Sequence, residues 1–195
     1  MKIWLIRHGQ TDWNVRGRIQ GSSDTDLNEE GKKQAKELAL ELVKTKHDPE
    51  IIYASTQKRA KETAQIISKY LKIPYATKKG LEEMNLGEWE GLSWEQVEER
   101  YQEEYQVWKN NRRYQNTPNG ESYQELLDRV LAAILEIIEE NAEKEHILIV
   151  THSAVIMSLL CYFSNTPFED MLQFKITNAG ISEFDSEQFL CVPKK

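Results

Sequence analysis

A run of five residues, 146–150, limits the folds open to this chain more than any other segment. Its sequence is His-Ile-Leu-Ile-Val. The run is shorter than a typical helix of a globular protein, and polar residues do not alternate with apolar ones in it. Strands that are buried on both faces have this composition, and they occur in parallel sheets covered by helices. Residues 2–6 and 50–54 form two similar apolar runs. Together the three runs predict a mainly parallel sheet in an α/β fold.

Helix-like periodicity fills the segments between these runs. Apolar residues recur there at intervals of three and four, which is the spacing of one helix face. Each of the three clearest segments begins with a side chain that can accept a hydrogen bond from the first helical turn. The expected caps are Asn28, then Ser55 or Thr56, and finally Ser122, which forms a capping box with Glu125.

Three weaker runs predict minor strands. Residues 181–184 and 189–192 lie near the end of the chain, while residues 73–77 contain Pro74, which restricts them to a sheet edge. The whole chain, residues 1–195, is long enough for one domain with a full hydrophobic core and short for two. We therefore expect a single domain.

Composition and charge exclude several classes of protein. The chain has 25 Lys and Arg against 32 Asp and Glu, so its net charge is −7, which argues against a surface for nucleic acid. No apolar run approaches the roughly 18 residues of a membrane helix, and the N-terminus lacks the pattern of a secretory signal. Cys161 and Cys191 form no paired motif, and both are expected to be buried. We predict a cytoplasmic protein without a nucleic-acid or membrane partner.

One segment carries nearly all of the net charge. Residues 82–104 contain nine Glu and one Arg, which sum to −8, and they are also rich in aromatic residues. They lie in a stretch of about residues 80–120 that is too long for a simple connection between strands. This stretch predicts an inserted helical lid, in which Arg112 and Arg113 could bind an anion. A solvated acidic helix with a few aromatic residues in the core explains most of the same pattern.

Basic and imidazole side chains follow three of the predicted strands. Arg7, His8 and Gly9 follow the first, Arg59 lies a few residues beyond the second, and His152 follows the third. Because ligand sites in open α/β sheets form at the carboxyl ends of the strands, these side chains should converge. A guanidinium group matches phosphate oxygens, a glycine allows close approach, and a neutral imidazole can attack phosphorus.

A metal site is the rival interpretation of the paired histidines. No Cys or Asp lies at ligand spacing near either imidazole, and the neighbouring guanidinium groups would repel a cation. Structural histidines in the core are a second alternative, which two imidazoles beside anion-binding groups make weaker. The sequence favours an anion site without a metal.

Several segments, in order along the chain, resemble motifs of one enzyme family. Residues 5–14, which include Arg7, His8 and Gly9, resemble the Arg-His-Gly signature of the histidine phosphatase superfamily, in its phosphoglycerate mutase-like branch. Later segments that resemble family motifs are residues 26–31, 55–64, 81–91, 119–122 and 150–152. Each segment alone is a weak match, but the ordered set spans nearly the whole chain and is specific.

The resemblance implies a role for each matching residue. His8 would be the nucleophile that forms a phosphohistidine, and Glu83 the general acid, with neighbouring Glu82 as the alternative. Those implied to bind the transferring phosphoryl group are Arg7, Arg59 and His152, and those implied to bind substrate are Asn14, Gly9, Gln20 and Ser153. Ser153 stands where the family commonly has glycine. No metal and no cofactor is implied.

The resemblance also implies a fold and an activity. The fold would be a three-layer α/β/α sandwich with a mostly parallel sheet, one antiparallel strand at residues 181–184, and the helical lid. The activity would be that of a cofactor-independent phosphomonoester hydrolase of the histidine acid phosphatase type, which acts on a small phosphorylated metabolite through a phosphohistidine. A phosphoglycerate mutase and an inactive phospho-ligand binding module are the alternatives. Sugar phosphates, phosphoglycerates, α-ribazole phosphate and phosphoserine all fit as substrates, and no oligomeric state is predicted.

Overall fold

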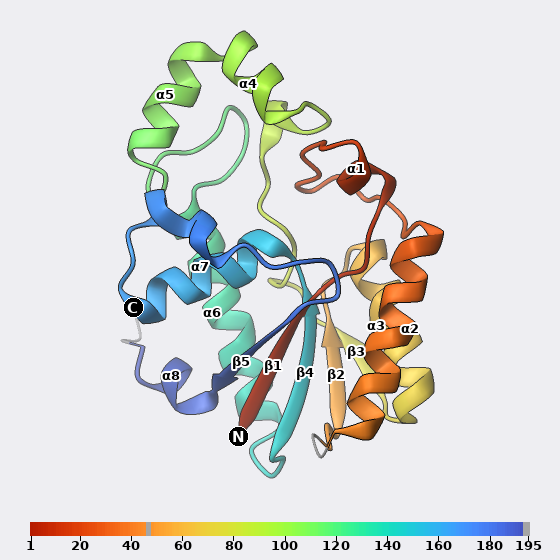
Figure 1. The fold of residues 1–195 in the computed structure, drawn as a ribbon. Coiled ribbons are helices and arrows are strands. Elements are labelled where there is room, and N and C mark those ends of the chain that lie inside the picture. The colour runs from red at the N-terminus through yellow and green to blue at the C-terminus, as the bar shows by residue number, and fades with distance from the viewer. Residues whose placement is uncertain (46–47, 193–195) are drawn as a thin grey trace.

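The protein forms a five-stranded sheet with helices on both faces (Figure 1). The computed structural model describes residues 1–45 and 48–192. The strands lie in the order β3-β2-β4-β1-β5, and only β5 runs antiparallel to its neighbour. Their bounds are β1 Lys2–Arg7, β2 Ile51–Ala54, β3 Tyr75–Thr77, β4 His146–Thr151 and β5 Ile181–Asp185. The predicted fold class is confirmed, including the edge strand and the antiparallel strand.

The helices divide between the two faces of the sheet. α2 and α3 cover one face, while α6, α7 and α8 lie on the other (Figure 1). Among the described residues, no helix is both long enough and apolar enough to cross a bilayer. The helices are α1 Asp12–Val15, α2 Glu29–Lys44, α3 Lys58–Leu71, α4 Trp94–Arg100, α5 Gln102–Asn110, α6 Tyr123–Glu140, α7 Ser153–Ser164 and α8 Ser186–Leu190, with short 3₁₀ segments η1 Gly87–Trp89 and η2 Phe168–Phe174.

The central strands bury both of their faces. In β1, Trp4 and Ile6 belong to the apolar cluster under α2 and α3, whereas Ile3 and Leu5 belong to the larger cluster under α6 and α7. Successive strand side chains point to opposite faces, so a strand covered on both sides needs apolar residues at every position. The same requirement explains the run at residues 147–150, all of which are completely buried.

Two of the three predicted helix caps are confirmed. The Asn28 side chain accepts a hydrogen bond from the Gly31 N–H (2.9 Å), and it begins α2. Ser122 and Glu125 form the expected capping box at the start of α6.

The predicted cap of α3 is wrong. α3 begins after Gln57, whose side chain forms no capping bond. The Ser55 hydroxyl is bonded to the His152 ring (2.8 Å), and the Thr56 hydroxyl donates to the Glu82 carboxylate (2.6 Å). Both hydroxyls are therefore engaged by side chains far away in the sequence.

The weak strand predicted at residues 189–192 is also wrong. This region follows a capping box formed by Asp185 and Gln188, and it belongs to α8 and the turn after it. Phe189 packs in the core. Cys161 is buried as expected, but Cys191 is exposed because it caps the end of α8 and faces solvent.

The acidic, aromatic stretch contains η1, α4 and α5, and the two helices lie beyond the carboxyl ends of the central strands (Figure 1). Trp89 is completely buried, and four aromatic rings surround it at centroid distances between 5.2 and 6.4 Å. The five glutamates between residues 95 and 104 are exposed. The aromatic residues thus extend the hydrophobic core that lies under α6 and α7, and the acidic residues are solvated.

The loop after β1 rests on the first turn of α2. A Cβ atom on Gly9 would collide with the Gly31 carbonyl, and a Cβ atom on Gly31 would collide with the carbonyl of Gln10. The Asn28 N–H donates to that same Gln10 carbonyl (3.0 Å). This close approach of two backbones fixes the direction in which the chain leaves β1.

We predict that Gly31→Ala destabilises the protein, although the substitution improves helix propensity. Propensity alone would favour alanine by about 1 kcal/mol, whereas overpacking against fixed backbone costs about 1–3 kcal/mol. Urea unfolding should therefore show a net loss in the free energy of unfolding. Lys36→Ala, on the exposed side of the same helix, serves as control and should change it by less than about 0.5 kcal/mol. A Gly31→Ala protein more stable than the wild type would contradict this packing.

Candidate active site

A cavity of about 490 Å³ opens where the central strands end. One part of its wall gathers polar side chains from separate segments of the chain, and another part is largely apolar or aromatic. The polar residues include Arg7 and His8 from the end of β1, Asn14 from α1, Arg59 from the first turn of α3, and Glu83 from the loop after β3. The sequence-predicted residues named in this list are therefore brought together.

The His8 ring is held in one tautomer. Its Nδ1 lies 2.7 Å from the Gly9 carbonyl oxygen, which can only accept, so Nδ1 carries the proton. Burial lowers the pKa of His8 well below its usual value, and the charges of Arg59 and Arg7 lower it further. At neutral pH the imidazole is therefore uncharged, and its Nε2 has a free lone pair.

The two guanidinium groups donate to backbone carbonyls. Arg59 donates to Ser23 (2.7 Å) and Gly21 (2.9 Å), and Arg7 donates to Ile176 (2.7 Å). The buried Nε atoms of both have no hydrogen-bond partner in the described part of the chain, and neither arginine forms an ion pair there. Burial lowers the pKa of Arg7, and it lowers the pKa of Arg59 to about 10, so both stay charged at neutral pH. Arg7 and Arg59 thus place two positive charges beside His8, and an anion can neutralise them.

The Glu83 carboxyl faces the cavity and is otherwise surrounded by protein. Its oxygens accept from the Met84 N–H (3.0 Å) and, more weakly, from the Ala154 N–H (3.4 Å). Burial raises the pKa of Glu83, and the charge of Arg59 opposes part of that rise. A carboxyl with a raised pKa keeps its proton to higher pH, as a general acid requires.

Glu82 points elsewhere. Its carboxylate accepts from the Thr56 hydroxyl (2.6 Å) and from the Gly80 N–H (2.7 Å), and it does not line the cavity. Of the two neighbouring acids, the geometry places only Glu83 beside the imidazole and the guanidinium groups.

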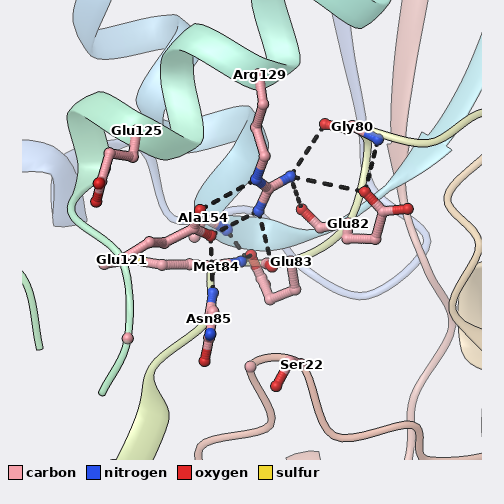
Figure 2. A network of polar contacts seen from close by, with 12 residues as sticks. Ser22, Gly80, Glu82, Glu83, Met84, Asn85, Glu121, Glu125, Arg129 and Ala154 are labelled. Carbon is pink, nitrogen blue, oxygen red and sulfur yellow. Dashed lines mark hydrogen bonds and ion pairs between the residues drawn. The ribbon is translucent and has the colours of Figure 1, made fainter. Parts of the chain in front are cut away.

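Arg129 of α6 holds the loop that carries Glu83 (Figure 2). Its guanidinium donates to the carbonyls of Gly80 (3.0 Å), Glu82 (2.8 Å) and Glu83 (3.0 Å). It also pairs with the Glu121 carboxylate at 2.6 Å. One planar group therefore holds three carbonyls of this loop, and the position of the Glu83 side chain depends on it.

His152 lies behind His8 and does not itself line the cavity. The centroids of the two rings are 5.2 Å apart. Its Nε2 is 2.8 Å from the Ser55 hydroxyl, and its Nδ1 is buried without a partner among the described residues. Burial, together with the charge of Arg59, lowers the pKa of His152 well below its usual value. The ring has room for one more hydrogen bond.

Asn14 and Gln20 both line the cavity, and within the described part of the chain their amide nitrogens form no hydrogen bond. The Asn14 side-chain oxygen accepts from the Thr11 N–H (3.0 Å) and from the Asn178 amide (3.2 Å). The Gln20 oxygen accepts from the hydroxyls of Thr11 (3.0 Å) and Thr25 (2.6 Å). Since the oxygens are engaged, each amide presents N–H donors to the cavity.

Gly9 does not reach the cavity, although the sequence groups it with the binding residues. Its N–H donates to the Thr63 hydroxyl (3.0 Å), and its lack of a side chain serves the contact with Gly31. Ser153, the first residue of α7, does line the cavity.

Arg112 and Arg113, which the sequence treats as a pair, face different places. Arg112 lines the cavity. Arg113 donates to the Gln124 side chain (2.8 Å), lies over the Phe168 ring (5.2 Å), and borders a second hollow of about 250 Å³.

Sequence reasoning missed Arg129 and Tyr123. Both occupy α6, where an amphipathic pattern gives every residue an ordinary packing or solvent role, so no local signal marks them. No three His, Cys, Asp or Glu side chains within residues 1–45 and 48–192 are placed to share a metal ion.

Comparison with known proteins gives consistent matches. The model of the histidine phosphatase superfamily (branch 1) matches residues 3–192. A metal-independent phosphoserine phosphatase of Arabidopsis thaliana is 38% identical over 81% of this chain and 66% of that protein. Phosphoglycerate mutase-like protein 4 of the same plant is 37% identical over 94% of this chain and 78% of that protein. The crystal structure of the α-ribazole phosphatase of Shigella flexneri has a TM-score of 0.80 and 30% identity, and it covers 95% of this chain and 90% of that one.

We predict that Arg129→Lys lowers the free energy of unfolding by about 1–3 kcal/mol, because one ammonium group cannot replace the fork of bonds to charged and carbonyl acceptors. Urea unfolding measures the loss. Arg100→Lys, at an exposed position of α4, is the matched control and should be nearly neutral. Equal effects of the two substitutions would show that Arg129 does not fix the loop.

Proposed function

The chain belongs to the histidine phosphatase superfamily (branch 1), and we propose that it is a cofactor-independent phosphomonoester hydrolase that works through a phosphohistidine. One observation carries the proposal. His8 is a neutral imidazole with a free Nε2 lone pair in a cavity where Arg7 and Arg59 hold two unpaired positive charges. A phosphoryl dianion fits that charge, and the lone pair can attack its phosphorus.

In the first step, the phosphoryl oxygens bind to Arg7 and Arg59, with the N–H groups of the Asn14 amide as further donors and the His152 ring behind His8. Nε2 of His8 forms a bond to phosphorus as the bond from phosphorus to the alcohol oxygen breaks. Glu83 transfers its proton to that oxygen, so the alcohol leaves neutral. The phosphohistidine ring is now positively charged, and its Nδ1–H bond to the neighbouring carbonyl stabilises this charge.

In the second step, the Glu83 carboxylate takes a proton from a water molecule, whose oxygen attacks phosphorus. The bond between phosphorus and Nε2 breaks, and inorganic phosphate leaves. His8 is neutral again and Glu83 protonated, so both groups are ready for a new cycle. The fixed guanidinium groups supply the positive charge that stabilises both transition states, and no step calls for a metal ion.

We further propose that residues 80–120 act as a lid of the single catalytic domain. Trp94 and Tyr105 from α4 and α5 line the same cavity as His8, so this segment encloses the alcohol part of the substrate. Relatives bear the names of phosphatases for phosphoserine and for α-ribazole phosphate, which differ in that part. Cys161 and Cys191 are free thiols, which supports a reducing compartment such as the cytoplasm.

A phosphoglycerate mutase is the second candidate, since one relative is named phosphoglycerate mutase-like protein 4. A mutase must retain the dephosphorylated product until it turns around and takes the phosphoryl group back. If water attacks the phosphohistidine before the product takes the phosphoryl group back, the same site acts as a phosphatase. A barrier difference of about 1.4 kcal/mol already decides this competition tenfold.

We predict hydrolysis without added metal. Purified protein in excess chelator should release inorganic phosphate from a panel of phosphomonoesters, because the arginines supply the charge. With 3-phosphoglycerate, phosphate release should exceed formation of 2-phosphoglycerate, whether or not 2,3-bisphosphoglycerate is added. Bisphosphoglycerate-dependent 2-phosphoglycerate formation that outpaces phosphate release would favour the mutase. Binding without any turnover would favour an inactive module.

Glu83→Gln should lower kcat/KM for alkyl phosphates by about 10²–10⁴-fold and affect kcat/KM for p-nitrophenyl phosphate much less, because kcat/KM reports phosphoryl transfer to His8 and nitrophenolate leaves without a proton. For the wild type acting on alkyl phosphates, kcat/KM should fall as pH rises through the raised pKa of Glu83, since only the protonated acid is active in this step. The variant should lack this fall.

Glu82→Gln is the matched control, because Glu82 is adjacent in sequence and absent from the cavity. Equal losses on both kinds of substrate for Glu83→Gln, or a larger loss for Glu82→Gln, would remove Glu83 from the role of acid.

A further inference from the structure

Arg112 is a buried cation in the wall of the active-site cavity. It follows α5, and only 8% of its surface is exposed. It shares the cavity wall with Trp108 and Tyr123, on a part of the surface that the proposed phosphoryl chemistry does not use. The cavity, at about 490 Å³, is far larger than a phosphoryl group needs, so it has room for the alcohol part of the substrate beside this wall.

The guanidinium of Arg112 lacks the partners that other buried arginines of this protein have. Its Nε is buried without a hydrogen bond, and no ion pair or hydrogen bond joins Arg112 to any described residue. Its one close polar contact is with the face of the Trp108 ring, at 4.6 Å from the centroid. Arg129, by contrast, donates to three carbonyls and to a carboxylate.

The Tyr123 hydroxyl is a second unengaged group beside it. Tyr123 is buried, lines the cavity, and forms no hydrogen bond with the described residues. Both groups lie against Trp108, since the Tyr123 ring is 6.2 Å from the Trp108 ring and the Arg112 guanidinium is 4.6 Å from it. Burial raises the pKa of Tyr123, and the positive charge of Arg112 acts in the opposite direction. Both are donors, and at neutral pH the tyrosine stays protonated.

No acceptor among the described residues is bonded to either donor. The same cavity is also lined by Trp94, Tyr105, Met157 and Met171. Contact with an aromatic face attracts a cation but does not replace the hydrogen bonds that it gives up on leaving water. A buried, unpaired guanidinium is costly to keep, and it is explained if a ligand supplies the missing acceptor.

We propose that Arg112 and Tyr123 form a second anion subsite, which selects phosphomonoesters whose alcohol part carries its own anionic group, either a carboxylate or a second phosphate. The proposal rests on the hydrolase function proposed above, since it names the substrate class of that same cavity. The exposed side chains of Arg18 and Lys175, also in the cavity wall, add positive charge that attracts such substrates.

Three substrates with the same carbon skeleton test this subsite. Glycerol 3-phosphate, 3-phosphoglycerate and glycerol 1,3-bisphosphate differ only in the group at the far carbon, which is a hydroxymethyl, a carboxylate or a phosphate ester. All release phosphate from a primary alcohol, so the chemistry at His8 is matched. We expect the wild-type kcat/KM to be at least about tenfold higher for one or both anionic substrates, and the better of the two identifies the group bound.

Arg112→Met should reduce this preference to within about threefold while leaving the free energy of unfolding equal or higher, because it removes a buried charge without partners. Tyr123→Phe should reduce the preference by a smaller factor. Arg113→Met is the matched control, since Arg113 borders the second hollow, and it should keep the wild-type preference. The substrate preference and urea unfolding are measured on the same preparations.

Three results would overturn the subsite: no wild-type preference, a preference that Arg112→Met retains, or a preference that Arg113→Met loses equally. A strong loss of stability in Arg112→Met would assign the residue to holding the lid and would also count against it. Hydrolysis of all three substrates at similar rates leaves the hydrolase proposal standing and removes only the subsite. Absence of phosphate release from every substrate removes the hydrolase proposal itself.

Discussion

Two positive charges beside an uncharged imidazole, at the base of a cavity, are the constraint on which the rest of this structure depends. Arg7 and Arg59 keep their charge although burial lowers the pKa of each. Backbone carbonyls, rather than carboxylates, receive their hydrogen bonds, so the charges are positioned without being neutralised. Burial lowers the pKa of His8, and the same two charges lower it further, so the ring stays unprotonated. Positive charges fixed in this way favour the binding of a phosphoryl dianion. They also favour the uncharged form of the imidazole, which is the nucleophilic form.

The carbonyls that receive these bonds belong to loops, and other parts of the chain hold the loops in place. The carboxylate of Glu90, just after η1, accepts bonds from both the N–H and the hydroxyl of Ser22 and of Ser23. The Ser23 carbonyl in turn accepts from Arg59. Arg129 holds the loop of Glu83 in a comparable way (Figure 2). The helical segment that covers the cavity is thereby connected to the charged groups at its base.

The central sheet could be predicted from the sequence because burial on both faces leaves a continuous apolar run, as at residues 146–150. Its three strand ends also predicted that Arg7, His8, Arg59 and His152 would converge. The failures have one physical cause, which is that local patterns do not contain tertiary partners. Ser55 looks like a cap but bonds to a histidine 97 residues away.

The same limit applies to the lid and to residues 189–192. A short apolar run suits a strand or a helix, and the capping box of Asp185 with Gln188 decides for the helix. Arg112 and Arg113 are adjacent and chemically identical, yet only one lines the cavity. The packing at the end of a helix decides which of two neighbouring side chains enters a site. That packing cannot be predicted from composition or from residue spacing.

The proposed mechanism depends most on Nε2 of His8 as the nucleophile that attacks phosphorus, and trapping the covalent intermediate tests this directly. The full chain is mixed with 3-phosphoglycerate or p-nitrophenyl phosphate, quenched in alkali within milliseconds, digested, and analysed by mass spectrometry. We expect a phosphate that is labile in acid, on the peptide containing His8, and its absence from His8→Asn. Phosphate on His152 instead, or none on either histidine while His8→Asn keeps the wild-type rate, would contradict it.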